Sequence, residues 1–293
     1  MMSSYPNSPA RPVEIREADL AAFSRRLEEE ERAKNTVDKY LRDLRAFVAF
    51  LRARGGEAAA DRRAVLDYKA ELERRYAPSS ANSMIAAINS FFRFLDHPEL
   101  CVRRLRIQRQ VFCKEERELT RVEYLRLVEA AERGKNVRLA MLLQTICGTG
   151  IRVSELRFIT CEAVRLGRAV VRCKSKTRTV FLVRDLQKKL REYCRREGIR
   201  HGCVFVTASG KPLDRSNIWR EMKALCRAAR VDPRKVFPHN LRHLFARSFY
   251  ALEKDLAKLS DILGHSSINT TRVYILSTGR EHRSEMEKMR LIL

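Results

Sequence analysis

Six side chains in the second half of the sequence could together break and rejoin a phosphodiester. They are two arginines, two histidines, a lysine and a tyrosine: Arg152, Lys174, His239, Arg242, His265 and Tyr274. Guanidinium groups neutralise the non-bridging oxygens of a phosphate as charge builds in the transition state. Histidine or lysine can move protons, and a tyrosine hydroxyl can attack phosphorus to form a covalent phosphotyrosine. Such a link would conserve the bond energy, so DNA could be cut and rejoined without ATP or metal.

The first arginine lies in the stretch Gly148–Leu156, which reads GTGIRVSEL. Its glycines can end one helix and turn the backbone tightly before the next. Arg152 and Glu155 are three residues apart, so on a helix they share a face and the carboxylate can brace the guanidinium. An ordinary surface ion pair is the alternative interpretation of this motif alone.

The second arginine lies in the stretch Pro238–Arg242, which reads PHNLR. Proline suits the first turn of a helix, where its missing N–H is not needed. His239 and Arg242 are again one turn apart, and near a helix N-terminus they could hold an anion. His243 follows directly but is rotated about a quarter turn away, so we expect it to be a packing or surface residue.

Of the remaining candidates, His265 and Lys174 lie in turns, and Tyr274 lies on a helical stretch that Ser266 or Ser267 can cap. Gly264 is suited to end a helix over Leu256–Leu263, which leaves His265 in the turn beyond it, nine residues before Tyr274. A tyrosine in such a place is normally half-buried core, which is the alternative for Tyr274. Lys174 lies in a polar turn between two β-branched runs, and a hairpin tip is narrow enough to enter a DNA groove. A solvated basic turn is the alternative there.

The composition favours a nucleic-acid partner for these residues. The chain has 293 residues, with 60 Lys and Arg against 36 Asp and Glu, a formal charge of +24 and a pI near 10.2. At 45% hydrophobic residues it can still bury a core. Residues 1–100 carry 17 basic and 16 acidic residues, and the rest of the chain carries 43 and 20. The positive excess that would attract a polyanion therefore lies in the second part. A ribosome-like or merely basic protein is the alternative.

Several classes of protein are not expected. The polar start Met1–Pro12 has no apolar region of a secretory signal, and no apolar run could span a bilayer. The eight cysteines include no C-x-x-C pair, so they indicate reduced core residues in the cytoplasm rather than disulfides or a zinc site. The sequence also lacks the paired carboxylates of a two-metal nuclease and a Walker-type glycine loop. We therefore expect a soluble, cytoplasmic protein with no membrane partner, no metal and no cofactor.

Apolar spacing predicts a mainly α fold with a small β-sheet, in two domains. Residues 14–100 form a helical domain, 101–118 an extended basic linker, and 119–293 a mixed α+β domain with a C-terminal tail. The linker contains three candidate DNA contacts, Arg103, Arg104 and Arg106. In the first domain the helices are expected over 18–31, 37–54, 62–76 and from Ser79 and Ser80 to 95. In the second domain they are expected over 120–131, 136–147, 184–197, 216–227, 238–251 and 256–263, with a hairpin of strands 169–173 and 179–183.

Taken in order, three motifs resemble the tyrosine recombinases, the family of phage integrases and Xer-type enzymes. They are TGIRVSEL around Arg152, PHNLRH from Pro238, and LGHSSINTTRVY ending at Tyr274. The resemblance covers about residues 119–280 well. Residues 16–100 resemble the helical core-binding (DNA-clamp) domain of the family more loosely, through Asn35, Thr36, Tyr40, Leu44 and Phe47.

The resemblance implies a site-specific recombinase that cuts DNA through a 3′-phosphotyrosyl intermediate and leaves a free 5′-hydroxyl. Tyr274 would attack the phosphate, Arg152 and Arg242 would hold it, and His239 and His265 would assist in proton transfer. Lys174 would be the general acid. Glu155 would support the first arginine, and Lys176 and Arg178 would contact DNA. Because the lysine turn is about one residue shorter than the Xer-type pattern, Lys176 is an alternative to Lys174.

The resemblance also implies partners. Two domains would close around double-stranded DNA, and four protomers would assemble on two DNA sites, where a partner recombinase or an accessory factor could take part. The task could be integration, excision or resolution, as for a mobile element, and the short region before the first helix favours a simple recombinase. The apolar end of the tail could dock on a neighbouring protomer or on its own domain. Two alternatives are a DNA-binding homologue that does not cut, and an enzyme like type IB topoisomerases that relaxes DNA.

Overall fold

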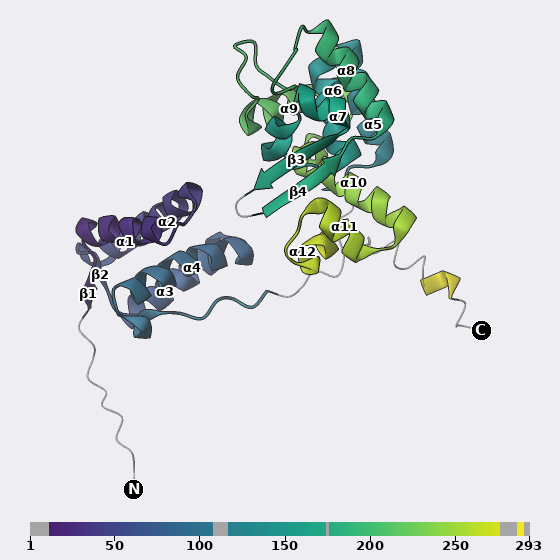
Figure 1. Ribbon diagram of the computed structural model, residues 1–293. Coiled ribbons are helices and arrows are strands. Elements are labelled where there is room, and N and C mark those ends of the chain that lie inside the picture. Colours follow the sequence, from purple (N-terminus) through teal and green to yellow (C-terminus); the bar gives the residue numbers. More distant parts are fainter. Residues whose placement is uncertain (1–11, 108–116, 174–175, 276–285, 290–293) are drawn as a thin grey trace. The chain divides into compact units, whose positions relative to one another are not determined.

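The computed structural model describes residues 12–107, 117–173, 176–275 and 286–289 (Figure 1). The chain divides into two compact units, residues 1–109 and 110–293. Each unit has its own core of buried apolar side chains. Within the described residues, no helix has both the length and the apolar character needed to cross a lipid bilayer.

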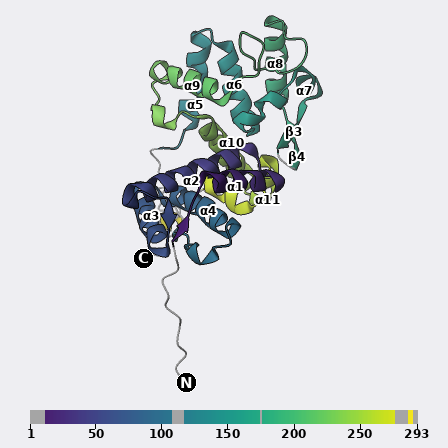
Figure 2. The same cartoon turned by 90° about the vertical axis from the view of Figure 1, so that its left-hand side faces the viewer.

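The first unit is a bundle of helices around an aromatic core. Figure 2 shows α2 lying along α3 and α4, and α1 also packs against α2. Phe23 and Phe91 meet edge to face with ring centroids 5.3 Å apart, and Phe47 and Phe92 do so at 5.9 Å. The elements are β1 (Val13–Glu14), α1 (Glu17–Glu29), α2 (Lys34–Gly55), β2 (Ala59–Ala60), α3 (Arg62–Arg75), α4 (Pro78–Phe94) and the 3₁₀ helix η1 (Pro98–Leu100).

Two helix starts in this unit differ from the prediction. Helix α2 begins at Lys34, so Asn35 and Thr36 lie inside its first turn and do not cap it. Helix α4 was expected to begin at Ser79 and Ser80, but it begins at Pro78, in a first turn where a residue without an N–H loses no hydrogen bond. The pairing of β1 with β2 was not predicted, because two-residue strands carry no period.

The first part of the basic segment 101–118 is fixed to the first unit. The Asn89 amide donates to the carbonyl of Val102 (2.8 Å) and accepts from its N–H (2.9 Å). Asn82 makes the same pair of bonds with Leu105, at 2.9 and 2.7 Å. These amides satisfy the backbone as a neighbouring strand would, so the segment runs extended along α4. Arg103, Arg104 and Arg106 all remain exposed.

The second unit is mainly helical and contains one hairpin. Helix α6 is its buried centre and lies against α5, α8 and α10. The elements are α5 (Arg121–Arg133), α6 (Val137–Thr149), η3 (Val153–Phe158), α7 (Cys161–Leu166), β3 (Arg168–Cys173), β4 (Lys176–Phe181), α8 (Arg184–Arg196), α9 (Arg215–Ala229), η4 (Pro233–Lys235), α10 (Pro238–Glu253), α11 (Leu256–Leu263), α12 (Ile268–Arg272) and η5 (Val273–Ile275).

The hairpin strands β3 and β4 are antiparallel, with Arg168 opposite Phe181 and Cys173 opposite Lys176. Lys174 and Ser175, which join the two strands, lie outside the described residues. The expected fold class, mainly α with a small antiparallel sheet, is confirmed. The short helix α7 was not predicted, because so few turns give too few positions to show a period, whereas α12 begins after its expected cap, Ser267.

Candidate active site

Two glycine turns lead into two of the site residues, Arg152 and His265. Gly150 follows α6 with φ +64°, and a Cβ there would lie 2.5 Å from a ring carbon of Phe245. Gly264 follows α11, also with φ +64°, and a Cβ there would collide with the side chain of Arg178. Only glycine suits both the left-handed backbone and the close approach at these positions. The backbone just beyond the first turn carries Arg152, and beyond the second it carries His265.

Glu155 is the acidic centre of the site and is 2% exposed. Its carboxylate pairs with Arg152 Nη1 at 2.9 Å and with Arg178 Nη2 at 2.6 Å, and it also accepts the backbone N–H of Arg152. Burial raises the pKa of this carboxyl, but the bonds from Arg152 and the charge of Arg178 outweigh burial and lower it. One charged carboxylate therefore fixes two guanidiniums that would otherwise repel each other.

Replacing Glu155 by Gln is expected to destabilise the second unit by about 3 kcal/mol, because two partly buried guanidiniums would lose their common counter-charge. Urea denaturation followed by circular dichroism measures the loss. Glu253→Gln is the matched control, since it breaks the exposed ion pair with Lys258 and should change the free energy of unfolding by less than about 1 kcal/mol. Equal effects of the two substitutions would contradict the bracing role of Glu155.

Arg242 is the most deeply buried charge of the site, at 1% exposure. Its guanidinium donates to the backbone carbonyls of Gly150 and Leu263 and contacts the His265 ring at 2.9 Å. Burial and the charge of Arg152 lower its pKa to about 10, although Tyr274 partly opposes this decrease. Arg242 therefore stays protonated at neutral pH and cross-links the two glycine turns.

The protonation of His265 follows from its partners. A guanidinium only donates hydrogen bonds, so the Nε2 atom facing Arg242 accepts and the ring proton is on Nδ1. Nδ1 then donates to the hydroxyl of Thr271 at 2.8 Å. Burial and the charges of Arg242 and Arg152 lower the pKa of His265 to about 4, so the ring is neutral at pH 7.

Tyr274 lies among imidazole rings and is 6% exposed. Its ring is stacked on His265 with centroids 5.3 Å apart and is 5.3 Å from the His239 ring. Desolvation first, then the neighbouring His243 and Arg242, lower the pKa of His239 to about 4, although the residue is exposed to solvent. A tyrosine beside the neutral His239 ring and the Arg242 guanidinium has both a proton acceptor and a group that can stabilise its anion.

The structure thus brings together most of the residues expected at the site, from four separate segments. They are Arg152, Glu155, His239, Arg242, His265 and Tyr274. Arg178, expected on a DNA surface, lies inside the site with its side chain 13% exposed and paired with Glu155. Lys174 lies outside the described residues, and Lys176 is described only as the first residue of β4.

Sequence reasoning missed His243 as a site neighbour. Its ring meets the Tyr274 ring edge to face, with centroids 4.3 Å apart, and lies 4.8 Å from the His239 ring. The signal was present in the spacing, because residues four apart on a helix are neighbours, as His239 and His243 are on α10.

Comparison with known proteins supports the resemblance to the phage integrase family over most of the chain. The phage integrase family matches residues 117–280, and the N-terminal SAM-like domain of phage integrases matches residues 20–98. The tyrosine recombinase XerD of Xanthomonas campestris pv. campestris is 32% identical over 276 residues, covering 85% of this chain and 84% of its own. The tyrosine recombinase XerA of Pyrococcus furiosus is 27% identical and covers 96% of this chain and 97% of its own.

Solved structures share the fold. A XerH site-specific recombinase bound to a palindromic difH substrate aligns with a TM-score of 0.68 and 18% identity, covering 86% of this chain and 78% of its own. A lambda integrase dimer bound to a COC′ core site aligns with a TM-score of 0.70 and 17% identity, covering 92% and 79%. With its motifs, its two domains and these relatives, the chain belongs to the phage integrase family and is a tyrosine recombinase, an enzyme that cuts and rejoins DNA in site-specific recombination.

Proposed function

We propose that Tyr274 is the nucleophile of this recombinase and that each cut passes through a 3′-phosphotyrosyl link. The observation that carries the proposal is the surroundings of the phenol, which lies between two neutral imidazoles and the Arg242 guanidinium. In this reaction the tyrosine oxygen bonds to phosphorus, the bond from phosphorus to the 5′ oxygen breaks, and the tyrosine proton moves to His239, since both ring nitrogens of His265 are already hydrogen-bonded. The same steps in reverse rejoin the strand, so the proposed reaction needs no ATP and no metal.

In this proposal the two arginines stabilise the charge that builds on the phosphate. Arg152 keeps about a third of its side chain exposed, with Nη1 held by Glu155. Arg242 is fixed through its two terminal nitrogens, and its buried Nε has no hydrogen-bond partner among the described residues. Preorganised donors of this kind stabilise a transition state without the cost of reorienting solvent.

We propose Lys174 as the general acid for the leaving 5′ oxygen, with Lys176 as the alternative. Lys174→Ala is expected to slow cleavage by about 10²–10⁴-fold, the usual value of one proton transfer. A substrate with sulfur at the bridging 5′ position should restore the rate, because a thiolate leaves without a proton. Single-turnover cleavage of the two substrates by the Lys174→Ala and Lys176→Ala variants measures this rescue. Rescue of the Lys176 variant alone would transfer the role to Lys176.

The proposed partner is double-stranded DNA, contacted by both units. The helical unit over 14–100 would hold the duplex, the segment 101–118 would join the units, and 119–293 would cut. Positive charge next to the first unit comes from exposed Arg103, Arg104 and Arg106. Lys176, at the start of β4, would be a further DNA contact in the second unit. Arg178, held by Glu155, would act on DNA only through the phosphate site.

We further propose a tetramer on two DNA sites in the cytoplasm, alone or with a partner recombinase or accessory factor, acting on a mobile element or in resolution.

A nicked duplex tests the proposal, because loss of the short fragment beyond the nick traps the cleaved intermediate. Duplexes from DNA that flanks the gene of this protein are incubated without metal or ATP, and a covalent adduct is sought after denaturation. An adduct supports cutting by tyrosine. Tight, selective binding without an adduct would favour the homologue that does not cut. Exchange between two sites, rather than relaxation of one supercoiled plasmid, separates a recombinase from an enzyme like type IB topoisomerases.

A further inference from the structure

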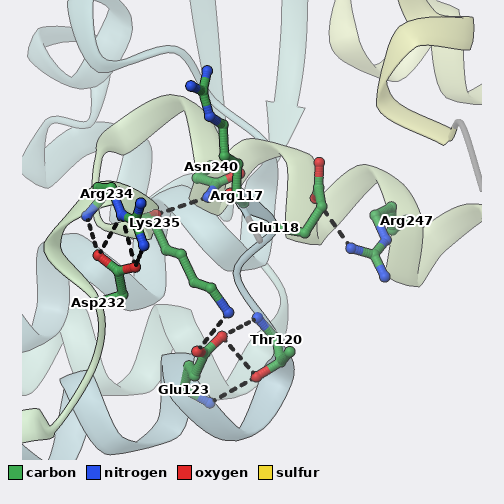
Figure 3. Close-up of polar contacts among 9 residues, drawn as sticks. All are labelled: Arg117, Glu118, Thr120, Glu123, Asp232, Arg234, Lys235, Asn240 and Arg247. Carbon is green, nitrogen blue, oxygen red and sulfur yellow. Dashed lines mark hydrogen bonds and ion pairs between the residues drawn. The ribbon is translucent and has the colours of Figure 1, made fainter. Parts of the chain in front are cut away.

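The segment 117–120, through which the chain enters the second unit, is attached to the helix that carries His239 and Arg242. The Asn240 amide on α10 donates to the carbonyl of Arg117 at 2.7 Å (Figure 3). Two residues on, Leu119 is buried in the core of the unit. Glu118 in this segment pairs with Arg247 of α10, and Glu123, on the first turn of α5, pairs with Lys235 and accepts from Thr120 (Figure 3). Contacts with Asn240 and Arg247 therefore hold the segment against α10.

Glu118 contacts two basic residues of α10 that are one helical turn apart. One carboxylate oxygen lies 3.0 Å from Arg247 Nη1, and the other lies 3.7 Å from His243 Nδ1. The Glu118 side chain is 14% exposed. Burial raises its pKa, but His243 and Arg247 outweigh burial and lower it. A charged carboxylate therefore faces one edge of the His243 ring.

The His243 ring also contacts the Tyr274 ring. The two rings are perpendicular (84°) with centroids 4.3 Å apart, closer than either His239 or His265 is to Tyr274. Among the described residues, Nδ1 of His243 is a buried atom without a hydrogen-bond partner, and the nearest carboxylate oxygen is that of Glu118. The side chain is 16% exposed, so it has little room to turn away.

We propose that Glu118 and His243 are positioning residues for Tyr274, an inference that rests on the proposed role of this tyrosine as nucleophile. Glu118 sets the orientation of the His243 ring, and that ring sets the orientation of the phenol. Neither residue touches the phosphate in this account. A misplacement of about 1 Å at a reacting atom can slow a reaction about 100-fold. Loss of the pair should therefore slow cleavage and leave DNA affinity unchanged.

The experiment measures single-turnover cleavage of the nicked duplex and, separately, DNA affinity by mobility shift. Glu118→Gln is expected to slow cleavage about 10- to 100-fold, with affinity within about twofold of wild type. Glu123→Gln is the matched control, because Glu123 fixes the same region through Lys235 at 2.9 Å without touching His243. Glutamine also retains the capping box that Glu123 forms with Thr120, so this variant should cleave at the wild-type rate.

Variants of His243 test whether Glu118 acts through this ring. His243→Ala should slow cleavage at least as much as Glu118→Gln, and adding Glu118→Gln to it should slow cleavage no further. His243→Phe keeps a flat ring against Tyr274, so it should recover most of the rate lost in His243→Ala. Equal cleavage rates for Glu118→Gln and Glu123→Gln would overturn the proposal. So would a double variant, Glu118→Gln with His243→Ala, whose cleavage is slowed by the product of the two single effects. An adduct that persists in Tyr274→Phe would instead overturn the nucleophile assignment, so the two failures are distinguishable.

Discussion

Replacing Tyr274 by Phe is expected to abolish the covalent adduct and spare DNA binding. Phenylalanine keeps the ring that packs against His239, His243 and His265 and removes only the hydroxyl. Loss of a catalytic nucleophile lowers the rate on the order of 10⁶-fold, so no adduct should be detectable. The measurement is denaturing gel analysis of labelled nicked duplex after incubation with each protein, alongside a mobility-shift titration.

Tyr250→Phe is a matched control for this substitution. Tyr250 also lies in the second unit, on α10, and packs with the small cluster of buried residues that contains Tyr274. Its variant should form the adduct at the wild-type rate. If the Tyr274→Phe protein still formed an adduct, the nucleophile would be another residue.

The second large effect is expected from Arg242→Lys, which keeps the charge and removes the planar fork. One ammonium cannot replace both terminal nitrogens, which bond to Gly150, Leu263 and His265. We expect cleavage to slow on the order of 10³-fold, the scale for losing an arginine that stabilises phosphoryl charge. Single-turnover cleavage at saturating protein measures the chemical step separately from binding.

Arg157→Lys is the control for Arg242→Lys. Arg157 belongs to the same unit but is exposed, with its guanidinium over the Phe158 ring at 5.1 Å. This variant should cleave within about twofold of wild type, since surface substitutions usually change stability by less than about 0.5 kcal/mol. Circular dichroism confirms that each variant is folded. If the folded Arg242→Lys protein cleaved DNA at a rate within tenfold of wild type, the planar guanidinium of Arg242 would not be essential for cleavage.

The apolar spacing of the sequence determined most of the helices. A helix needs only local hydrogen bonds and one apolar stripe, so its residues carry the information. Helix α11 was predicted with the observed ends, Leu256 and Leu263, and the Thr120 and Gly264 caps agree with the structure. The boundaries that differed, at Lys34 and Pro78, follow Ala33 and Ala77, which have no side-chain capping bond that the sequence could indicate.

The sequence by itself also determined the residue types of the site, because phosphate chemistry needs particular groups and these recur in three compact motifs. Only the tertiary structure decided which of them meet. Glu155 was predicted to brace Arg152, but it also holds Arg178, which lies 23 residues later on a strand. Glu118 and His243 are 125 positions apart, and no local period connects them. Contacts between distant segments depend on how the helices pack, and that packing brought Glu118 to the His243 ring that contacts Tyr274.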